Sequence, residues 1–304
     1  MTRMFSTTCA AALAAFAAAP ALADIEVQTY TGPVTVAENP ETVVVYDMPA
    51  LDNLDALGVP VAGSIAPIYV DYLQGYEGEM GTLFEPDYEA LHALSPDLVI
   101  AGGRSSSVAG DLNDVAPTID MTLWGDDVLA AMEEQLTAYG AIFGKEAEAE
   151  QLIANIEAQL AETRAAVEGQ GDGLILMTNG PNISVYGPGS RFGYLYDAIG
   201  LTPAISAEDI ESEEATHGDA ISFEFIAEAD PDWLLVLDRA AAIGSGDQSA
   251  EATLDNAIMR ETSVWQDGRV VYLNSADLYI AMGGYTSTMT TLELIEDVFA
   301  GAGS

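Results

Sequence analysis

Three arginines follow apolar, strand-like runs of the sequence. Arg104 comes after DLVIAGG, Arg191 after NISVYGPGS and Arg239 after DWLLVLD. In open α/β sheets, ligands bind beyond the carboxyl ends of the strands, so these positions are expected to face one crevice. The arginine side chain stays charged and offers a fixed fork of donors that suits oxygen anions. The pattern therefore predicts a binding site for an anionic ligand.

The scarcity of basic residues strengthens this interpretation. The 304-residue chain has 8 Lys+Arg against 49 Asp+Glu, a formal net charge of −41. A single arginine in such a protein is equally well explained by a surface ion pair. Three arginines at equivalent strand ends favour a binding site instead. The glycine-broken turn GPGSRFG around Arg191 would let the backbone approach a large ligand.

Tyrosine and histidine residues offer further candidates. Tyr279, in LNSADLYIAMGGY, follows the last strand-like run; taken alone, it fits a packed aromatic residue of the core. His217, in EEATHGDAISFEFI, lies in a predicted loop before a helix capped by Ser222 and is free to point into a cleft. Its context alone does not identify it as a ligand. His92, in YEALHALSPD, is expected to be a structural or surface residue of a helix.

The spacing of apolar residues predicts an α/β fold with two lobes. Short apolar strands alternate with amphipathic helices over residues 24–144 and again over 170–304. Between them, residues 145–169 contain no Gly or Pro until Gly169 and repeat apolar side chains at helical spacing. One long helix is therefore expected to join an N-terminal lobe to a C-terminal lobe. Its apolar positions are Leu152, Ile156, Leu160 and Val167.

Residues 1–23 have the features of a secretory signal peptide. They combine an early Arg3, an Ala-rich apolar run and the small-residue cleavage signature Ala21-Leu22-Ala23. The run is shorter than the roughly 20 apolar residues that a bilayer span needs. The single cysteine, Cys9, lies within it and lacks the pattern of a lipid-modified cysteine, so lipid anchoring is not expected. The sequence predicts export to the periplasm of a mature chain without disulfides.

The acidic composition excludes nucleic acid as a partner, because the chain would repel the phosphate backbone. Carboxylates spread along most of the chain are typical of a solvated surface in high salt, where screening weakens self-repulsion. The run SAEDIESEEA at 206–215 is interpreted in this way. A mobile acidic flap beside a site is the alternative for that run.

Other functional classes fit the sequence less well. GPGSRFG matches neither of the common glycine-rich phosphate-binding patterns, which argues against a nucleotide enzyme. A secreted hydrolase would need a nucleophile and a base, but the chain has no G-x-S-x-G motif and only His217 is suitably placed as the base. A zinc or manganese receptor is also disfavoured, because the two histidines are far apart and the mature chain lacks cysteine.

Several stretches resemble the periplasmic substrate-binding proteins of iron–siderophore ABC transporters, particularly the catecholate-binding branch. In the C-terminal half these are GPGSRFGYLYDAIGLTPA, HGDAISFEFIAEADPDWLLVLDR, TLDNAI and VVYLNSADLYIAMGG, and in the N-terminal half FEPDYEALHALSPDLVIAGGR. SPDLVIAGGR is shared widely among such binding proteins, whereas GPGSRFG with THG and the late tyrosine is more specific. The resemblance covers nearly all of the mature chain.

This resemblance implies two lobes bridged by a rigid helix, the helical-backbone periplasmic binding protein fold, with the siderophore held between them. Arg104, Arg191 and Arg239 match pocket arginines of that branch, and His217 and Tyr279 match residues that can bind iron directly. The implied protein is a monomer with no catalytic role and no intrinsic cofactor, which passes a ferric siderophore to an ABC permease. Haem and corrinoid receptors share the scaffold and remain alternatives. Unlike some such pockets, GGRSSS has no second basic residue just after Arg104.

Overall fold

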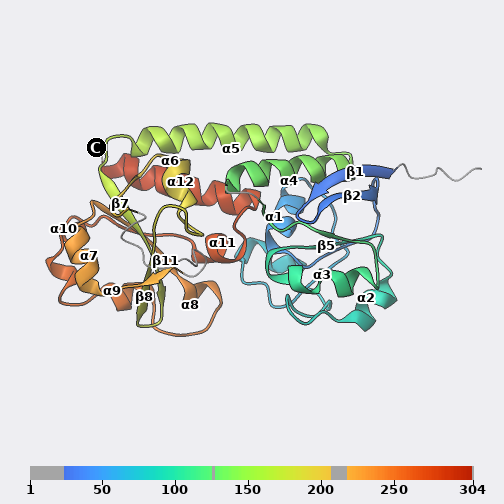
Figure 1. The fold of residues 1–304 in the computed structure, drawn as a ribbon, viewed down its shortest axis with the longest axis horizontal. Coiled ribbons are helices and arrows are strands. Elements are labelled where there is room, and N and C mark those ends of the chain that lie inside the picture. Colours follow the sequence, from blue (N-terminus) through green and yellow to red (C-terminus); the bar gives the residue numbers. More distant parts are fainter. Residues whose placement is uncertain (1–23, 125–126, 207–217, 303–304) are drawn as a thin grey trace, which may run out of the picture.

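The computed structural model describes residues 24–124, 127–206 and 218–302. Within them the chain forms two lobes that lie side by side, each built on its own sheet (Figure 1). The two sheets lie under one long helix that runs across both lobes. The α/β class and the two-lobe architecture predicted from the sequence are confirmed.

The N-terminal lobe is built on a parallel sheet with strand order β4-β3-β5-β6. A separate antiparallel hairpin, β1 with β2, precedes this sheet along the chain. The strands are β1 Asp24–Thr29, β2 Gly32–Ala37, β3 Val43–Val45, β4 Gly63–Ser64, β5 Leu98–Ala101 and β6 Thr118–Asp120. Its helical segments are α1 Met48–Ala56, the 3-10 helix η1 Asp71–Tyr76, α2 Tyr88–Leu94, the 3-10 helix η2 Gly103–Val108, α3 Ala109–Asn113 and α4 Val128–Phe143.

The C-terminal lobe contains a mixed sheet with the order β10-β8-β7-β11-β12, and β9 also pairs with β7. Among the described pairings of this sheet, the two made by β8 are antiparallel and the others are parallel. The strands are β7 Asp172–Asn179, β8 Asn182–Tyr186, β9 Thr202–Pro203, β10 Asp219–Ala220, β11 Trp233–Asp238 and β12 Val270–Tyr272. Its helical segments are α6 Tyr194–Ile199, α7 Phe223–Ala229, α8 Arg239–Ala242, α9 Ala250–Leu254, the 3-10 helix η4 Met259–Glu261, α10 Ser263–Gln266, α11 Ser275–Ile280 and α12 Tyr285–Ala302.

Alternating side chains bury both faces of the central strands of this second sheet. On β11, Trp233, Leu235 and Leu237 join the larger core cluster, which extends through both lobes. The intervening Leu234 and Val236 join a smaller cluster on the opposite face. The Trp233 ring stacks on Phe299 of α12, with ring centroids 4.0 Å apart. A strand buried on both faces is expected in a sheet covered by helices on both sides.

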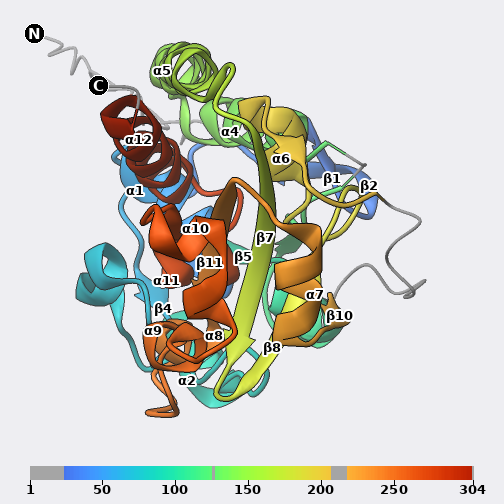
Figure 2. The same cartoon turned by 90° about the vertical axis from the view of Figure 1, so that its left-hand side faces the viewer.

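The long helix α5, Glu146–Val167, extends along both lobes (Figure 1). Acidic residues in the first turn of α5 stabilise the helix, because they lie near the positive end of its dipole. The helix ends shortly before Gly169, whose φ is +76°. Its buried residues include Ile156 and Leu160, and it packs against α4 and α12. Viewed from one end of the molecule, β7 runs from the region of α5 toward the opposite side of its lobe (Figure 2).

We expect this arrangement to restrict how far the lobes can move. A continuous helix packed on both lobes resists the wide hinge bending that flexible connecting strands allow. Loading the protein with a ligand held between the lobes should therefore leave the small-angle X-ray scattering profile nearly unchanged. A large compaction on loading would show that α5 bends or that its packing is released.

Candidate functional site

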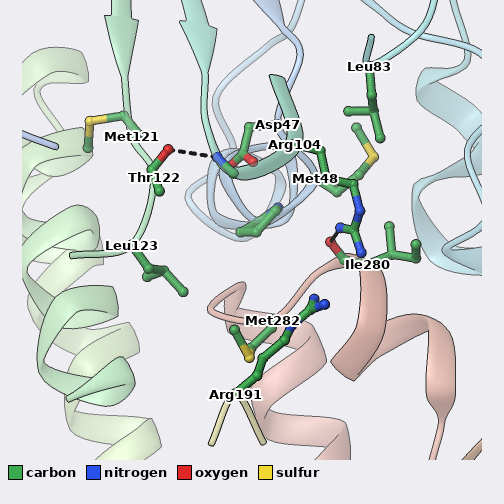
Figure 3. Close-up of a pocket in the computed structure, with 12 residues that line it drawn as sticks. Asp47, Met48, Leu83, Arg104, Met121, Thr122, Leu123, Arg191, Ile280 and Met282 are labelled. Carbon is green, nitrogen blue, oxygen red and sulfur yellow. Dashed lines mark hydrogen bonds between the residues drawn. The ribbon is translucent and has the colours of Figure 1, made fainter. Parts of the chain in front are cut away.

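A cavity of about 460 Å³ is lined by residues of both lobes (Figure 3). The N-terminal lobe contributes the start of α1, the loop at Leu83, the start of η2 and the segment after β6. The C-terminal lobe contributes the turn before α6 and the end of α11. The lining residues are Asp47, Met48, Pro49, Leu83, Gly103, Arg104, Met121, Thr122, Leu123, Arg191, Ile280 and Met282.

Arg104 reaches across from η2 to the end of α11 in the other lobe. Its two terminal nitrogens donate hydrogen bonds to the backbone carbonyls of Tyr279, at 2.5 Å, and Ile280, at 3.4 Å. The glycine pair before it makes this placement possible. A Cβ on Gly102 would lie 2.9 Å from the Asp47 carboxyl carbon, and Gly103 adopts a φ of +49°.

Arg191 approaches the same carbonyl from the C-terminal lobe. Its Nη2 donates to the Tyr279 carbonyl at 2.9 Å, so this one oxygen accepts from an arginine of each lobe. The turn that carries Arg191 is tight: a Cβ on Gly193 would lie 2.1 Å from the Gly187 carbonyl oxygen. Glycine is therefore required at position 193. Figure 3 shows the Arg104 and Arg191 side chains pointing toward each other across the cavity.

Arg239 binds the side chain of the same tyrosine. It is the first residue of α8, directly after the end of β11. Its Nε donates to the Tyr279 hydroxyl at 3.0 Å, and its Nη1 donates to the Asn179 side-chain carbonyl at 3.2 Å. Arg239 is not among the cavity-lining residues, so its place in the site rests on its hydrogen bond to Tyr279.

Tyr279 is thus the residue on which the three arginines converge. The guanidinium carbons of Arg104, Arg191 and Arg239 lie 4.9, 5.0 and 5.7 Å from the centre of its ring. Burial opposes ionisation of the phenol, but the hydrogen bond from Arg239 and the charges of the three arginines outweigh it and lower the pKa of Tyr279. The site therefore lets this phenol ionise more readily than an ordinary tyrosine.

No carboxylate neutralises the arginine cluster within the described ranges. The ion pairs between cations and carboxylates in the described part of the chain are Lys145–Glu148, Arg260–Asp255 and Arg269–Asp232, and none of them involves Arg104, Arg191 or Arg239. Burial lowers the pKa of Arg191, and the nearby charge of Arg104 lowers it further. Like charges held together at a partly buried site repel each other, and an anion that binds between them lowers the electrostatic free energy.

The acidic residue in the cavity wall, Asp47, is only partly charged near pH 7. Its Oδ2 accepts the Ala50 N–H and caps α1, and the residue is 5% exposed. Burial raises the pKa of Asp47 to about 7, although the Ala50 hydrogen bond and the charge of Arg104 act in the opposite direction. A carboxyl group with this pKa is partly neutral near pH 7, so it only partly offsets the positive charge of Arg104.

The structure brings together four of the five site residues predicted from the sequence: Arg104, Arg191, Arg239 and Tyr279. His217 lies outside the described residues. His92 is an exposed residue in the last turn of α2 and is not among the residues that line the cavity. No group of three or more His, Cys, Asp or Glu side chains suited to a metal ion occurs in the described part of the chain.

Sequence reasoning missed the apolar wall of the cavity. It consists mainly of Met48, Met121, Met282, Leu83 and Leu123. These are ordinary apolar residues scattered along the chain, so no local signal in the sequence separates them from packing residues. The flexible, polarisable thioethers of methionine suit a surface that adapts to ligand shape.

Two lobes along one long helix, with a cationic cavity lined from both, define the class of extracytoplasmic solute-binding proteins. Residues 43–276 match the family model described as periplasmic binding protein, and the chain belongs to this family. None of the helices in the described residues is both long enough and apolar enough to cross a bilayer.

Relatives with known names or structures cover most of the chain. The petrobactin-binding protein YclQ of Bacillus subtilis is 33% identical over 86% of this chain and 83% of its own length. A TroA-like periplasmic binding protein from Xylanimonas cellulosilytica is 39% identical, with a TM-score of 0.81 over 91% of this chain and 98% of its own. The catecholate-siderophore binding protein VctP of Vibrio cholerae is 28% identical, with a TM-score of 0.82 over 90% of this chain and all (100%) of its own.

The lowered pKa of Tyr279 generates a prediction for the ligand-free protein. A phenol in this setting should ionise below the usual tyrosine pKa of about 10. Tyr279→Phe should remove this early step from a titration of phenolate absorbance in the near ultraviolet. Arg239→Ala should move the step to higher pH, because both a hydrogen bond and a positive charge are lost. Arg260→Ala is the matched control, since Arg260 pairs with Asp255 away from the site; an equal effect of both variants would contradict the assignment.

Proposed function

We propose that this chain captures a ferric siderophore of the catecholate type outside the cytoplasm and delivers it to an ABC permease for iron uptake. One observation carries the proposal. In a chain with 49 acidic residues, three arginines converge on one tyrosine, and among the described residues none of the three forms an ion pair with a carboxylate. Such a cluster is best explained by an anionic ligand that supplies the missing negative charge.

Ferric catecholates have the chemistry that this site requires. Ferric iron is a hard, oxygen-preferring cation, and each catecholate brings two negative charges, so the complexes are anionic. The guanidinium groups can leave the Tyr279 and Ile280 carbonyls and donate charge-assisted hydrogen bonds to the catecholate oxygens. The apolar wall formed by Met121, Leu123 and Met282 provides a surface for the aromatic rings and for the scaffold that joins them.

The relatives support this class of ligand over the alternatives. YclQ is named for petrobactin, VctP for catecholate siderophores, and a 29% identical protein of Vibrio anguillarum for ferric anguibactin. These names favour a siderophore over haem or a corrinoid. They also weigh against a secreted hydrolase, for which no histidine base lies among the described residues that line the cavity.

The surrounding assignments belong to the same proposal. The chain acts as a monomeric receptor in the periplasm without catalysis, and residues 1–23 direct its export and are then removed. It carries no cofactor of its own, because the iron arrives within the transported ligand. The permease partner recognises the loaded protein and accepts the complex from between the lobes.

Tyr279 and His217 are proposed to complete the coordination of iron. Ferric iron favours six ligands, and a siderophore with two catecholates supplies four oxygens, which leaves two positions. The phenolate of Tyr279 is favoured by the three arginines, and His217 would add a neutral nitrogen. With a hexadentate siderophore the iron is already saturated, and both residues would then only contact the ligand.

Removing a single pocket arginine tests the anion site. Arg191→Ala and Arg239→Ala should each weaken binding of a ferric catecholate by about 1.5 to 3 kcal/mol, the scale of a hydrogen bond to a charged group. Arg260→Ala should bind like wild type. Fluorescence-quenching titration measures all three affinities. Unchanged affinity in both pocket variants would contradict the assignment, and absence of binding by the wild type would contradict the function.

Direct coordination is tested by comparing two kinds of ferric complex. With a tetradentate bis-catecholate, Tyr279→Phe and His217→Ala should each lower the affinity and shift the visible charge-transfer band, since an iron ligand is lost. With a hexadentate tris-catecholate both changes should have much smaller effects. Spectra and affinities identical to wild type with the tetradentate complex would remove these residues from the iron coordination shell.

A further inference from the structure

Two side chains of α1 hold the beginning of α12, although more than 200 residues separate the two helices along the chain. Asp52 and Asn53 are both fully buried, at 0% exposure. Helix α1 belongs to the N-terminal lobe, whereas α12 follows directly from α11, which carries Tyr279. We call the contact of Asp52 and Asn53 with the start of α12 the interlobe clasp.

The interlobe clasp caps the first turn of α12. Asp52 accepts the Thr286 N–H at 3.0 Å through Oδ1 and the Ser287 N–H at 2.9 Å through Oδ2. Asn53 Oδ1 accepts the Tyr285 N–H at 2.9 Å. A helix leaves its first N–H groups without partners inside the helix, and a residue just before the helix usually satisfies them. Here the other lobe does so.

Two neighbouring contacts fix the geometry of the clasp. The Asn53 side-chain amide donates to the Gly283 carbonyl at 3.3 Å, and the Tyr72 hydroxyl donates to Asp52 Oδ2 at 2.8 Å. Gly284 makes the close approach possible, because a Cβ at this position would lie 2.2 Å from Asp52 Oδ2. The glycine pair before α12 therefore has a structural reason that the sequence alone does not give.

Hydrogen bonds connect the clasp with the binding site. Ser287, whose N–H binds Asp52, donates its hydroxyl to the Ala281 carbonyl at 2.6 Å. Ala281 directly follows α11 as its C-cap residue, two residues after Tyr279. Farther along α12, the Thr290 hydroxyl donates to the Asp277 carboxylate at 2.7 Å. The end of α11 is thus fixed on one side by the clasp and bound on the other by Arg104 and Arg191.

We infer that Asp52 and Asn53 are positioning residues for the siderophore site, an inference that rests on the proposed function. By holding the start of α12 they fix the end of α11. They thereby fix the position of Tyr279 relative to the arginines and to the iron of the bound ligand. The clasp also keeps the N-terminal lobe attached to this segment when a ligand draws Arg104 away from the α11 carbonyls. Release of the clasp lets Tyr279 shift and loosens the hold on the bound complex.

The test replaces Asp52 by its uncharged isostere. Asp52→Asn should release a tetradentate ferric bis-catecholate about five- to tenfold faster than wild type in stopped-flow measurements, the low end of typical coupling between sites. It should also shift the visible charge-transfer band of the bound complex. Asp55→Asn is the matched control: Asp55 lies on the same helix and accepts a hydrogen bond from Tyr76, but it is exposed, and within the described residues its side chain has no hydrogen bond to α12. This control should keep the wild-type rate and spectrum.

The outcomes separate positioning from simple stabilisation. If Asp52→Asn lowers the melting temperature but keeps the wild-type release rate and spectrum, the clasp only stabilises the fold and the inference is wrong. If Asp52→Asn does not fold, Asn53→Ala, which retains the Asp52 carboxylate, is measured in the same way. If wild-type protein binds no ferric catecholate, the proposed function fails, and the inference, which rests on it, fails with it.

Discussion

The site depends on holding three positive charges at one tyrosine without a neutralising carboxylate. Repulsion between guanidinium groups would separate them if nothing bound them, and the end of α11 provides the acceptors. Two of the arginines bind backbone carbonyls at the carboxyl end of this helix, where the helix dipole favours positive charge, and the third binds the phenol. The backbone carbonyls are neutral acceptors, so they fix Arg104 and Arg191 in place without cancelling their charge. A carboxylate at the same position would compete with the ligand.

The net charge of the whole chain acts against the ligand at long range. A protein with a formal charge of −41 repels an anionic complex until the two are close. At physiological ionic strength this repulsion is screened over about 8 Å, whereas contacts between arginine and ligand inside the cavity are screened much less. The partly neutral state of Asp47 helps the attraction inside the cavity, because it limits the negative charge beside the arginines. High external salt would therefore favour capture by suppressing the repulsion while largely preserving the site.

The sequence was sufficient to predict the fold class and the arginines because both depend on local patterns. Apolar runs mark the strands, and an arginine directly after such a run faces the ligand side of an α/β sheet. Tyr279 could not be assigned from its own context, since its role comes from three partners that are 40 to 175 positions away in the chain. The resemblance to a family supplied that assignment. The methionine-lined wall and Asp52 were missed for a similar reason. The local sequence does not separate the wall residues from packing residues, or Asp52 from an exposed acidic residue, until distant segments are placed beside them.

The two ties between the lobes differ in how a ligand can affect them. Arg104 connects the N-terminal lobe to α11 through hydrogen bonds inside the cavity, and a ligand with better acceptors competes for that guanidinium. Asp52 connects the same lobe to the same segment through buried bonds that a ligand in the cavity does not reach. Binding can therefore redirect the arginines from carbonyl to catecholate while the lobes stay joined behind the site. Because α5 and the interlobe clasp both restrict the relative movement of the lobes, the response to a ligand is concentrated in side chains at the end of α11.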